Sequence, residues 1–232
     1  MKAKELALLL DKQAYSESSS ILHFYTQDKG YQTFIFKGGL KKKKALNQLG
    51  LYELTYFKRP ESDLGIINQL DFAWSAFQMY QHPQKVLLVF FVADILKQTL
   101  RHQGPDPLLF DFLRAQIIGL ETNNNDKYFP TSFLAQYLMI MGYAPLLEHD
   151  DPKHFDLKRG VFDTAQLESI DCIDDPGLVA FLKAQFWPTA EPQFQKEHLK
   201  AGLQILVRYA GMHIPGFHLD KTLEILHETL YS

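Results

Sequence analysis

The chain has 232 residues, of which 46% are hydrophobic and 13% aromatic, and its formal net charge is -3. This length and composition fit one large or two small globular domains and exclude general disorder. A single cysteine, Cys172, excludes an intramolecular disulfide and a zinc site built from several cysteines. The longest apolar runs are too short to span a bilayer, so the sequence predicts a soluble, cytoplasmic protein without a membrane partner.

The first 75 residues have the pattern of short β-strands. Segments rich in β-branched and aromatic residues alternate with turn residues, and this pattern predicts five strands. The expected strands are 4–11, 19–26, 31–38, 49–59 and 64–73. In the third strand, the alternation places Phe34 and Phe36 on one face and Tyr31 and Lys37 on the other. The longest connection follows this strand and contains the run of lysines 41–44.

After about residue 75 the apolar residues recur at helical spacing. The expected helices are 84–102, 106–122, 131–143, 178–187, 196–211 and 220–230. A polar, acidic segment around 146–177, free of cysteine except for Cys172, separates the third helix from the fourth, and we expect a solvated hairpin or loop there. The sequence therefore predicts a multi-domain α+β protein, with a five-stranded barrel in residues 1–76 and an all-α helical domain in 77–232.

Positive charge is concentrated in the strand region. Residues 1–80 contain 11 basic and 8 acidic residues, and the remainder contains 13 and 19. A five-stranded module with its longest connection after the third strand is typical of an OB-fold, which binds oligonucleotides on strands two and three. Single-strand binding proteins of this type combine basic side chains for phosphates with aromatic rings for bases. The expected DNA-binding residues are Tyr31, Lys37, Lys41, Lys42, Lys43, Lys44, Lys58 and Arg59.

Other functions stay open at this point. A lysine run is often a solvated loop and strand aromatics are often core, so the alternative is a protein-interaction module whose basic loop contacts an acidic protein partner. An enzyme is a further alternative, but the sequence has no phosphate-binding loop, no nucleophile elbow and no His-Glu-x-x-His motif. Cys172 lies among acids, which disfavour its thiolate. We expect no catalytic residue.

Three stretches carry a family resemblance. Residues 14–38 contain a Tyr-x-Glu-Ser-Ser turn, a Thr-x-x-x-Gly hairpin and a Lys-Gly end of the third strand. Residues 93–113 contain Pro-Asp-x-x-Leu-Phe-x-x-Leu, and residues 134–145 end on Gly-Tyr-x-Pro. In this order and spacing, which covers about residues 1–160, the chain resembles the RecO family of bacterial recombination mediators.

The resemblance implies an N-terminal OB domain, a helical domain and a non-enzymatic function in DNA repair and recombination. A member of this family is expected to bind single- and double-stranded DNA, to anneal complementary strands and to help RecA displace the single-strand binding protein SSB. The implied partners are DNA, RecR, the acidic C-terminal tail of SSB and, indirectly, the RecA filament. The resemblance implies no cofactor.

One segment departs from the family pattern. Many RecO proteins carry a four-cysteine zinc module after the Gly-x-x-Pro turn, where this chain has no cysteine. Potential ligands stand there instead: His149, Asp150, Asp151, His154 and Asp156. Their spacing lacks the paired ligands of a zinc site, so we expect a zinc-free variant of the family.

The late helix offers a candidate site for the SSB tail, which in many bacteria ends in acidic residues followed by Pro-Phe. If residues 197–210 are helical, an apolar stripe forms from Leu199, Leu203, Leu206 and Ala210. Basic residues lie around this stripe, and Glu197 is the nearest acid in the sequence. The expected tail-binding residues are Lys200, Leu203 and Arg208, with a purely structural role of the stripe as the alternative.

Overall fold

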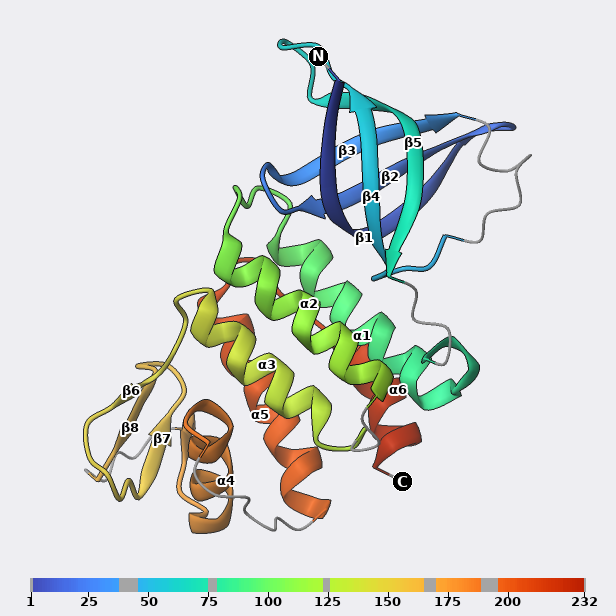
Figure 1. Cartoon of the computed structure of the whole chain (residues 1–232). Helices are drawn as coiled ribbons and strands as arrows, with labels where there is room; N and C mark the ends of the chain where they lie inside the picture. Colours follow the sequence, from blue (N-terminus) through green and yellow to red (C-terminus); the bar gives the residue numbers. More distant parts are fainter. Residues whose placement is uncertain are drawn as a thin grey trace. The chain divides into compact units, whose positions relative to one another are not determined.

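The computed structural model describes residues 2–37, 46–74, 79–122, 126–164, 170–188 and 196–231 (Figure 1). The predicted contact residues Lys41, Lys42, Lys43 and Lys44 lie outside these ranges. The chain divides into two compact units, residues 1–123 and 124–232. This division differs from the expected domain boundary at 76/77, which marks the change from strands to helices and stays a prediction.

Five strands of the first unit close into a barrel. They are β1 Lys2–Ser16, β2 Ser19–Thr26, β3 Gly30–Lys37, β4 Leu51–Phe57 and β5 Leu64–Trp74. The order around the barrel is β1-β2-β3-β5-β4, with β4 pairing antiparallel to β1 and β3 pairing parallel to β5. This closed barrel is the OB-fold that the sequence predicts.

Strand β1 is longer than the predicted 4–11 because it pairs with two neighbours. Residues 2–8 pair with β4, and residues 7–16 pair with β2. A register shift between Leu9 and Asp11 marks a β-bulge, which bends the strand from one partner towards the other. Residues 12–16 are all exposed, so their sequence has no apolar alternation to reveal the strand.

Alternate side chains from all five strands fill the barrel. They are Ala7, Leu9, Leu22, Phe24, Phe34, Phe36, Tyr52, Leu54, Tyr56, Ile67 and Leu70. The ring centroid of Phe34 lies 4.8 Å from that of Tyr56 and 6.0 Å from that of Phe24. Phe34 and Phe36 therefore face inward, and Lys37 is exposed on the opposite face, as the alternation predicts.

Helices α1 Pro83–Thr99 and α2 Pro107–Thr122 complete the first unit, together with the short helix η1 Met79–Gln81. The connection between α1 and α2 contacts the start of β3. Tyr31 N donates a hydrogen bond to Gln103 O at 3.0 Å, and the Tyr25 hydroxyl donates to Gly104 O at 3.1 Å. Gly30 has a φ of +68°, and a Cβ at this position would lie 2.4 Å from Gln103 O. Glycine is required here for both its conformation and its size.

The second unit consists of four helices and a small sheet. The helices are α3 Phe129–Ile140, α4 Pro176–Phe186, α5 Lys196–His213 and α6 Asp220–Leu230. The strands are β6 Leu146–Leu147, β7 His154–Asp156, β8 Val161–Asp163 and β9 Cys172–Ile173, in the order β6-β8-β7-β9. With α1 and α2, the helices match the six that the periodicity predicts. Among the described residues, no helix has the length and apolar character needed to cross a membrane.

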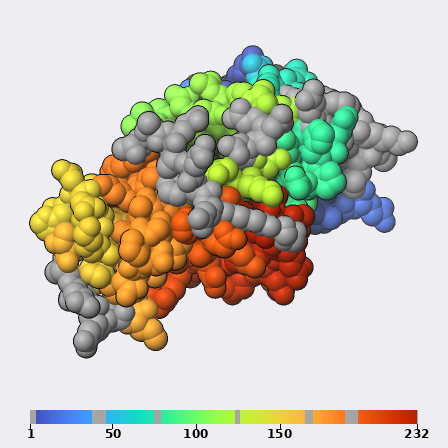
Figure 2. Space-filling model, turned by 90° about the horizontal axis from the view of Figure 1, so that it is seen from below, coloured from blue at the N-terminus to red at the C-terminus, as the bar shows by residue number. Residues whose placement is uncertain are grey.

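The segment around 146–177 contains a hairpin of β7 and β8, which is one of the two expected forms, but part of it is buried. It forms this small sheet, and Phe155, Leu157 and Phe162 are fully buried. The rings of Phe155 and Phe162 stack with centroids 4.1 Å apart, and Phe155 also contacts Tyr209 of α5. In the space-filling view the yellow segment lies directly beside the orange residues of the following helices (Figure 2). The few apolar residues among many polar ones are spaced too irregularly to predict this core.

Candidate nucleic-acid interface

The outer face of β3 carries the sequence-predicted contact residue Tyr31 near its start and Lys37 at its end. Thr33 and Ile35 lie between them on the same face and are half-buried. His23 of β2 pairs with Thr33, and β5 runs parallel on the other side. Two hollows open on this face, one towards each end of β3.

The first hollow, which we name the Tyr31 hollow, has a volume of about 270 Å³. It is lined by Asp11, Gln13, His23, Tyr31, Lys97 and Arg101. The first four come from strands β1, β2 and β3. Lys97 comes from the last turn of α1, and Arg101 lies in the connection that follows this helix. Lys97 and Arg101 are both exposed. The hollow thus joins an aromatic wall to two cations and one carboxylate.

An aromatic pair forms the floor of the Tyr31 hollow. The Tyr31 hydroxyl lies 2.8 Å from His23 Nδ1, and the two rings stack with centroids 5.8 Å apart. If Nδ1 accepts the hydroxyl hydrogen, the ring proton of neutral His23 is on Nε2. Burial lowers the pKa of His23, Asp11 raises it and Arg101 lowers it further, with a net decrease. His23 is therefore neutral at pH 7, and the pair presents uncharged ring surface between the cations.

Contacts within the first unit hold the two cations beside this floor. The residues that follow Arg101 are fixed to the barrel by the hydrogen bonds of Tyr31 and Tyr25 to the α1–α2 connection. Gly30 permits this close approach because it has no side chain. At the other end of the helix pair, Lys85 Nζ donates to Leu120 O of α2 at 2.8 Å. The Tyr31 hollow is therefore built by the fold, and its cations do not depend on a free loop.

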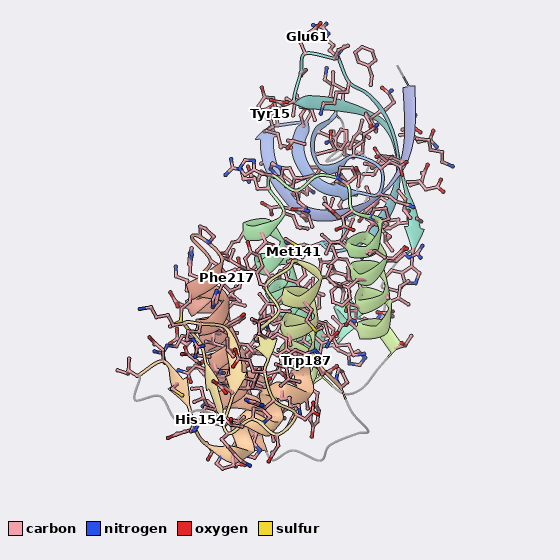
Figure 3. The ribbon with its side chains drawn as sticks, turned by 90° about the vertical axis from the view of Figure 1, so that its left-hand side faces the viewer. Tyr15, Glu61, Met141, His154, Trp187 and Phe217 are labelled. Carbon is pink, nitrogen blue, oxygen red and sulfur yellow. The ribbon has the colours of Figure 1, made fainter. Side chains whose placement is uncertain are left out.

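The second hollow, which we name the Phe57 hollow, has a volume of about 320 Å³. It is lined by Ile35, Phe57, Arg59, Ser62, Leu64 and Ile66. Phe57 is 42% exposed and Ile66 37% exposed, so the floor is apolar and open to solvent. Arg59 lies in the connection between β4 and β5, whose tip at Glu61 is labelled in Figure 3. Ser62 N donates to Arg59 O at 3.1 Å, which makes this connection a tight turn.

The sequence-predicted DNA-binding residues are placed as follows. Tyr31 lines the first hollow and Arg59 the second, and Lys37 is exposed at the end of β3, next to the lysine run. Lys58 is half-buried, and its Nζ donates to Gln32 Oε1 at 2.7 Å, so it is less available than the others.

Lys97 and Arg101 are not predicted from the sequence as part of this interface. The two basic residues belong to the part of the chain with an excess of acids, and nothing in their local sequence indicates that they lie beside Tyr31. The position of Phe57 follows from the alternation in β4. Leu54 and Tyr56 point inward, so the next residue points outward.

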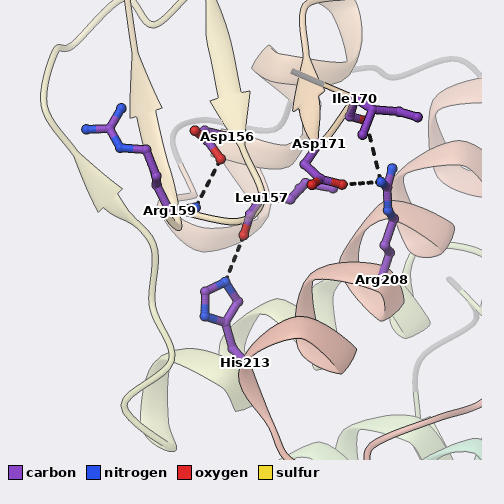
Figure 4. A network of polar contacts seen from close by, with 7 residues as sticks. All are labelled: Asp156, Leu157, Arg159, Ile170, Asp171, Arg208 and His213. Atoms are coloured by element: carbon purple, nitrogen blue, oxygen red, sulfur yellow. Dashed lines mark hydrogen bonds and ion pairs between the residues drawn. The ribbon is translucent and has the colours of Figure 1, made fainter. Parts of the chain in front are cut away.

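The predicted tail pocket on α5 is closed. Leu203 is 0% exposed and belongs to the core with the rest of the apolar stripe, so it presents no exposed surface to a tail, and its role in tail binding stays a prediction. Arg208 already has an acidic partner within the chain. Its guanidinium pairs with the Asp171 carboxylate and also donates to Ile170 O (Figure 4). Lys200 is exposed, and its role stays a prediction.

This contact belongs to a polar network that holds the small sheet against α5 (Figure 4). His213 Nε2 donates to Leu157 O at 2.8 Å, one turn after Arg208 along the helix. Arg159 N donates to Asp156 Oδ1 at 3.0 Å and closes the turn between β7 and β8. The contacts of Arg208 and His213 join residues more than 35 positions apart, so the sequence around Arg208 does not reveal them.

Another hollow of the second unit combines apolar side chains with two lysines and the two acids Asp150 and Asp151. It has a volume of about 240 Å³ and lies between residues 150–153 and α4. Its apolar wall contains Trp187, which is labelled in Figure 3, with Pro152, and Lys153 and Lys183 are at its rim. Lys153 pairs with Asp151 at 2.7 Å, and this hydrogen bond lowers the pKa of the Asp151 carboxyl. We name this the Trp187 hollow.

The residues considered as metal ligands are dispersed. Within the described ranges, no group of three or more His, Cys, Asp or Glu side chains is arranged to hold a metal ion. His149 Nε2 lies 3.7 Å from Asp163 Oδ1, and Asp156 accepts a backbone hydrogen bond. The zinc-free state stays a prediction. Burial raises the pKa of the Cys172 thiol, and Asp156 adds to this effect, so Cys172 is a poor nucleophile.

Comparisons with known proteins are consistent along the chain. A sequence model of the family described as "Recombination protein O N terminal" matches residues 1–75. The chain is 23% identical over 231 residues to "DNA repair protein RecO" of Christiangramia forsetii, with 96% of each chain covered. It is 24% identical to the protein of that name from Azobacteroides pseudotrichonymphae, with 98% of each chain covered. The protein of that name from Porphyromonas gingivalis is 25% identical, and 97% of this chain is covered.

Proposed function

Because the chain belongs to the RecO family, we propose that it acts in DNA repair as a DNA-binding protein. In finer terms, it binds single- and double-stranded DNA, anneals complementary strands and assists the loading of RecA on SSB-coated DNA. It does this in the cytoplasm and without catalysis. The observation that carries the proposal is the outer face of β3, where two hollows each join ring or apolar surface to basic side chains.

This face fits a single strand of DNA. Tyr31 and Ile35 are four residues apart on one face of β3, which corresponds to about 13 Å, so one strand crosses both hollows. Its bases contact the open surface around Phe57 and the ring of Tyr31, and its phosphates contact Arg59, Lys97 and Arg101. The lysine run, residues 41–44, follows β3 in the sequence and is proposed to add further phosphate contacts.

The Trp187 hollow replaces the α5 stripe as our candidate receptor for the SSB tail. A terminal phenylalanine would lie against Trp187 and Pro152, and its carboxylate would contact Lys153 or Lys183. RecR and the RecA filament remain partners implied by the family, and no particular surface of the chain is proposed for them.

Salt-dependent DNA binding tests the proposed interface. We would measure the affinity of the full-length chain for a labelled single-stranded oligonucleotide at several salt concentrations. Each phosphate contact contributes about 0.7 to the slope of log affinity against log salt. Replacing Lys97 and Arg101 with alanine should therefore weaken binding to all sequences and flatten the slope by about 1.4.

A double variant of Lys127 and Lys221, exposed lysines of the second unit, is the matched control for the loss of two charges. It should leave the slope unchanged. If both double variants bind like the wild type, the interface is misplaced. If the chain binds no DNA and binds an acidic protein through the lysine run, the alternative function as a protein-interaction module is correct.

A further inference from the structure

We propose that the Tyr31 hollow is a pocket for one unpaired guanine base, and that the Asp11 carboxylate selects guanine by accepting its N1–H and N2–H groups. The proposal rests on the proposed function, because it requires a DNA strand on the outer face of β3. It adds a preference for one base to an interface that otherwise contacts the DNA backbone and the ring faces of the bases.

The position of Asp11 motivates the proposal. A carboxylate repels phosphates, so its presence in the same hollow as two cations on a DNA-binding face calls for a different role. An ionised carboxylate only accepts hydrogen bonds, and it offers two oxygens side by side. Among the DNA bases, guanine alone carries two adjacent N–H donors on its Watson–Crick edge. The match is bidentate and charge-assisted, which is the strong form of such a contact.

Gln13 supplies the complementary donor. It is two residues after Asp11 and therefore on the same face of β1. Its Nε2 donates to Asp11 Oδ2 at 3.3 Å, so the two side chains are close enough to face neighbouring atoms of one base edge. The third atom of the guanine edge is O6, an acceptor. Asp11 and Gln13 together present two acceptors and one donor to a base that presents two donors and one acceptor.

The remaining walls accommodate the rest of the nucleotide. The half-buried ring of Tyr31, held by its contact with His23, provides a face for stacking. Lys97 and Arg101 lie on the same rim and contact the phosphate. The volume of about 270 Å³ is sufficient for one base.

The experiment compares two oligonucleotides that differ by one amino group. One is oligothymidine with a single central guanine, and the other has hypoxanthine, which lacks the N2 amino group, at the same position. The full-length chain is titrated with each at one salt concentration. A hydrogen bond to a charged group accounts for about a tenfold preference for guanine.

Variants of the pocket assign the preference. Asp11→Asn should reduce the ratio of the two affinities to near one, although it removes a negative charge and raises both affinities. Asp28→Asn, the same charge change at an exposed turn, should keep the tenfold ratio. Gln13→Ala should weaken binding of both oligonucleotides equally, because both bases carry O6.

The outcomes separate this inference from the proposed function. If the wild type binds both oligonucleotides with equal affinity and normal salt dependence, DNA binding stands and the guanine pocket is overturned. A preference that persists in Asp11→Asn would overturn the role of Asp11. If neither oligonucleotide binds, both the proposed function and this inference fail.

Discussion

Replacing Gly30 with alanine tests how the fold builds the Tyr31 hollow. Gly30 has a φ of +68°, and an added Cβ would lie 2.4 Å from both Gln103 O and the carbonyl carbon of Gly104. These are backbone atoms, so the α1–α2 connection has to move away from β3. Gly142 is a matched control, because its φ is +82° and a Cβ there has no neighbour within 4 Å.

The expected magnitudes differ for a physical reason. The left-handed conformation costs alanine about 1–2 kcal/mol relative to glycine, and Gly142→Ala should lower the unfolding free energy by about this amount. Gly30→Ala also disturbs the hydrogen bonds from Tyr31 N and the Tyr25 hydroxyl to the connection. Each hydrogen bond contributes about 0.5–1.5 kcal/mol, so the total loss should be about 2–5 kcal/mol.

Urea unfolding followed by tryptophan fluorescence measures these losses. The chain has two tryptophans, one in each compact unit, so a Trp187→Phe background reports on the barrel unit through Trp74 and a Trp74→Phe background on the second unit. Gly30→Ala should also weaken DNA binding more than Gly142→Ala does, because Arg101 moves with the connection. Equal losses of stability in the two variants would refute the reasoning, since the close approach at Gly30 would then cost nothing.

Two further predictions concern single sites. The pKa of His23 is lowered in the folded chain, so the imidazole binds a proton more readily in the unfolded chain. The unfolding free energy should therefore be highest above about pH 6.5 and decrease as the pH falls below this value. In urea unfolding between pH 7.5 and 5.5, the unfolding free energy of His23→Gln should depend less on pH than that of the wild type. An identical pH dependence in both proteins would contradict the lowered pKa of His23. For the Trp187 hollow, a labelled peptide with an acidic sequence and a terminal Pro-Phe should bind more weakly to a Lys153→Ala, Lys183→Ala double variant than to the wild type. A loss of binding in Lys200→Ala instead would return the site to α5.

The barrel and the helices follow from local patterns in the sequence. In β3 the alternation of Phe34 and Phe36 with Tyr31 and Lys37 is enough to separate the core face from the outer face, because successive side chains of a strand point to opposite sides. The helices follow from apolar residues at helical spacing, and the buried stripe with Leu203 is an example. Each pattern depends on residues that are neighbours in the chain.

The composition of the candidate site depends on the tertiary structure. Lys97 and Arg101 line the same hollow as Asp11 because the α1–α2 connection is held against Gly30, and this contact joins segments about 70 residues apart. The pairing of Arg208 with Asp171 and the burial of Phe155 arise in the same way. A local pattern determines which side of its own element a residue faces. Which other element covers that side is decided by the path of the whole chain, and that path places the cations beside the aromatic floor.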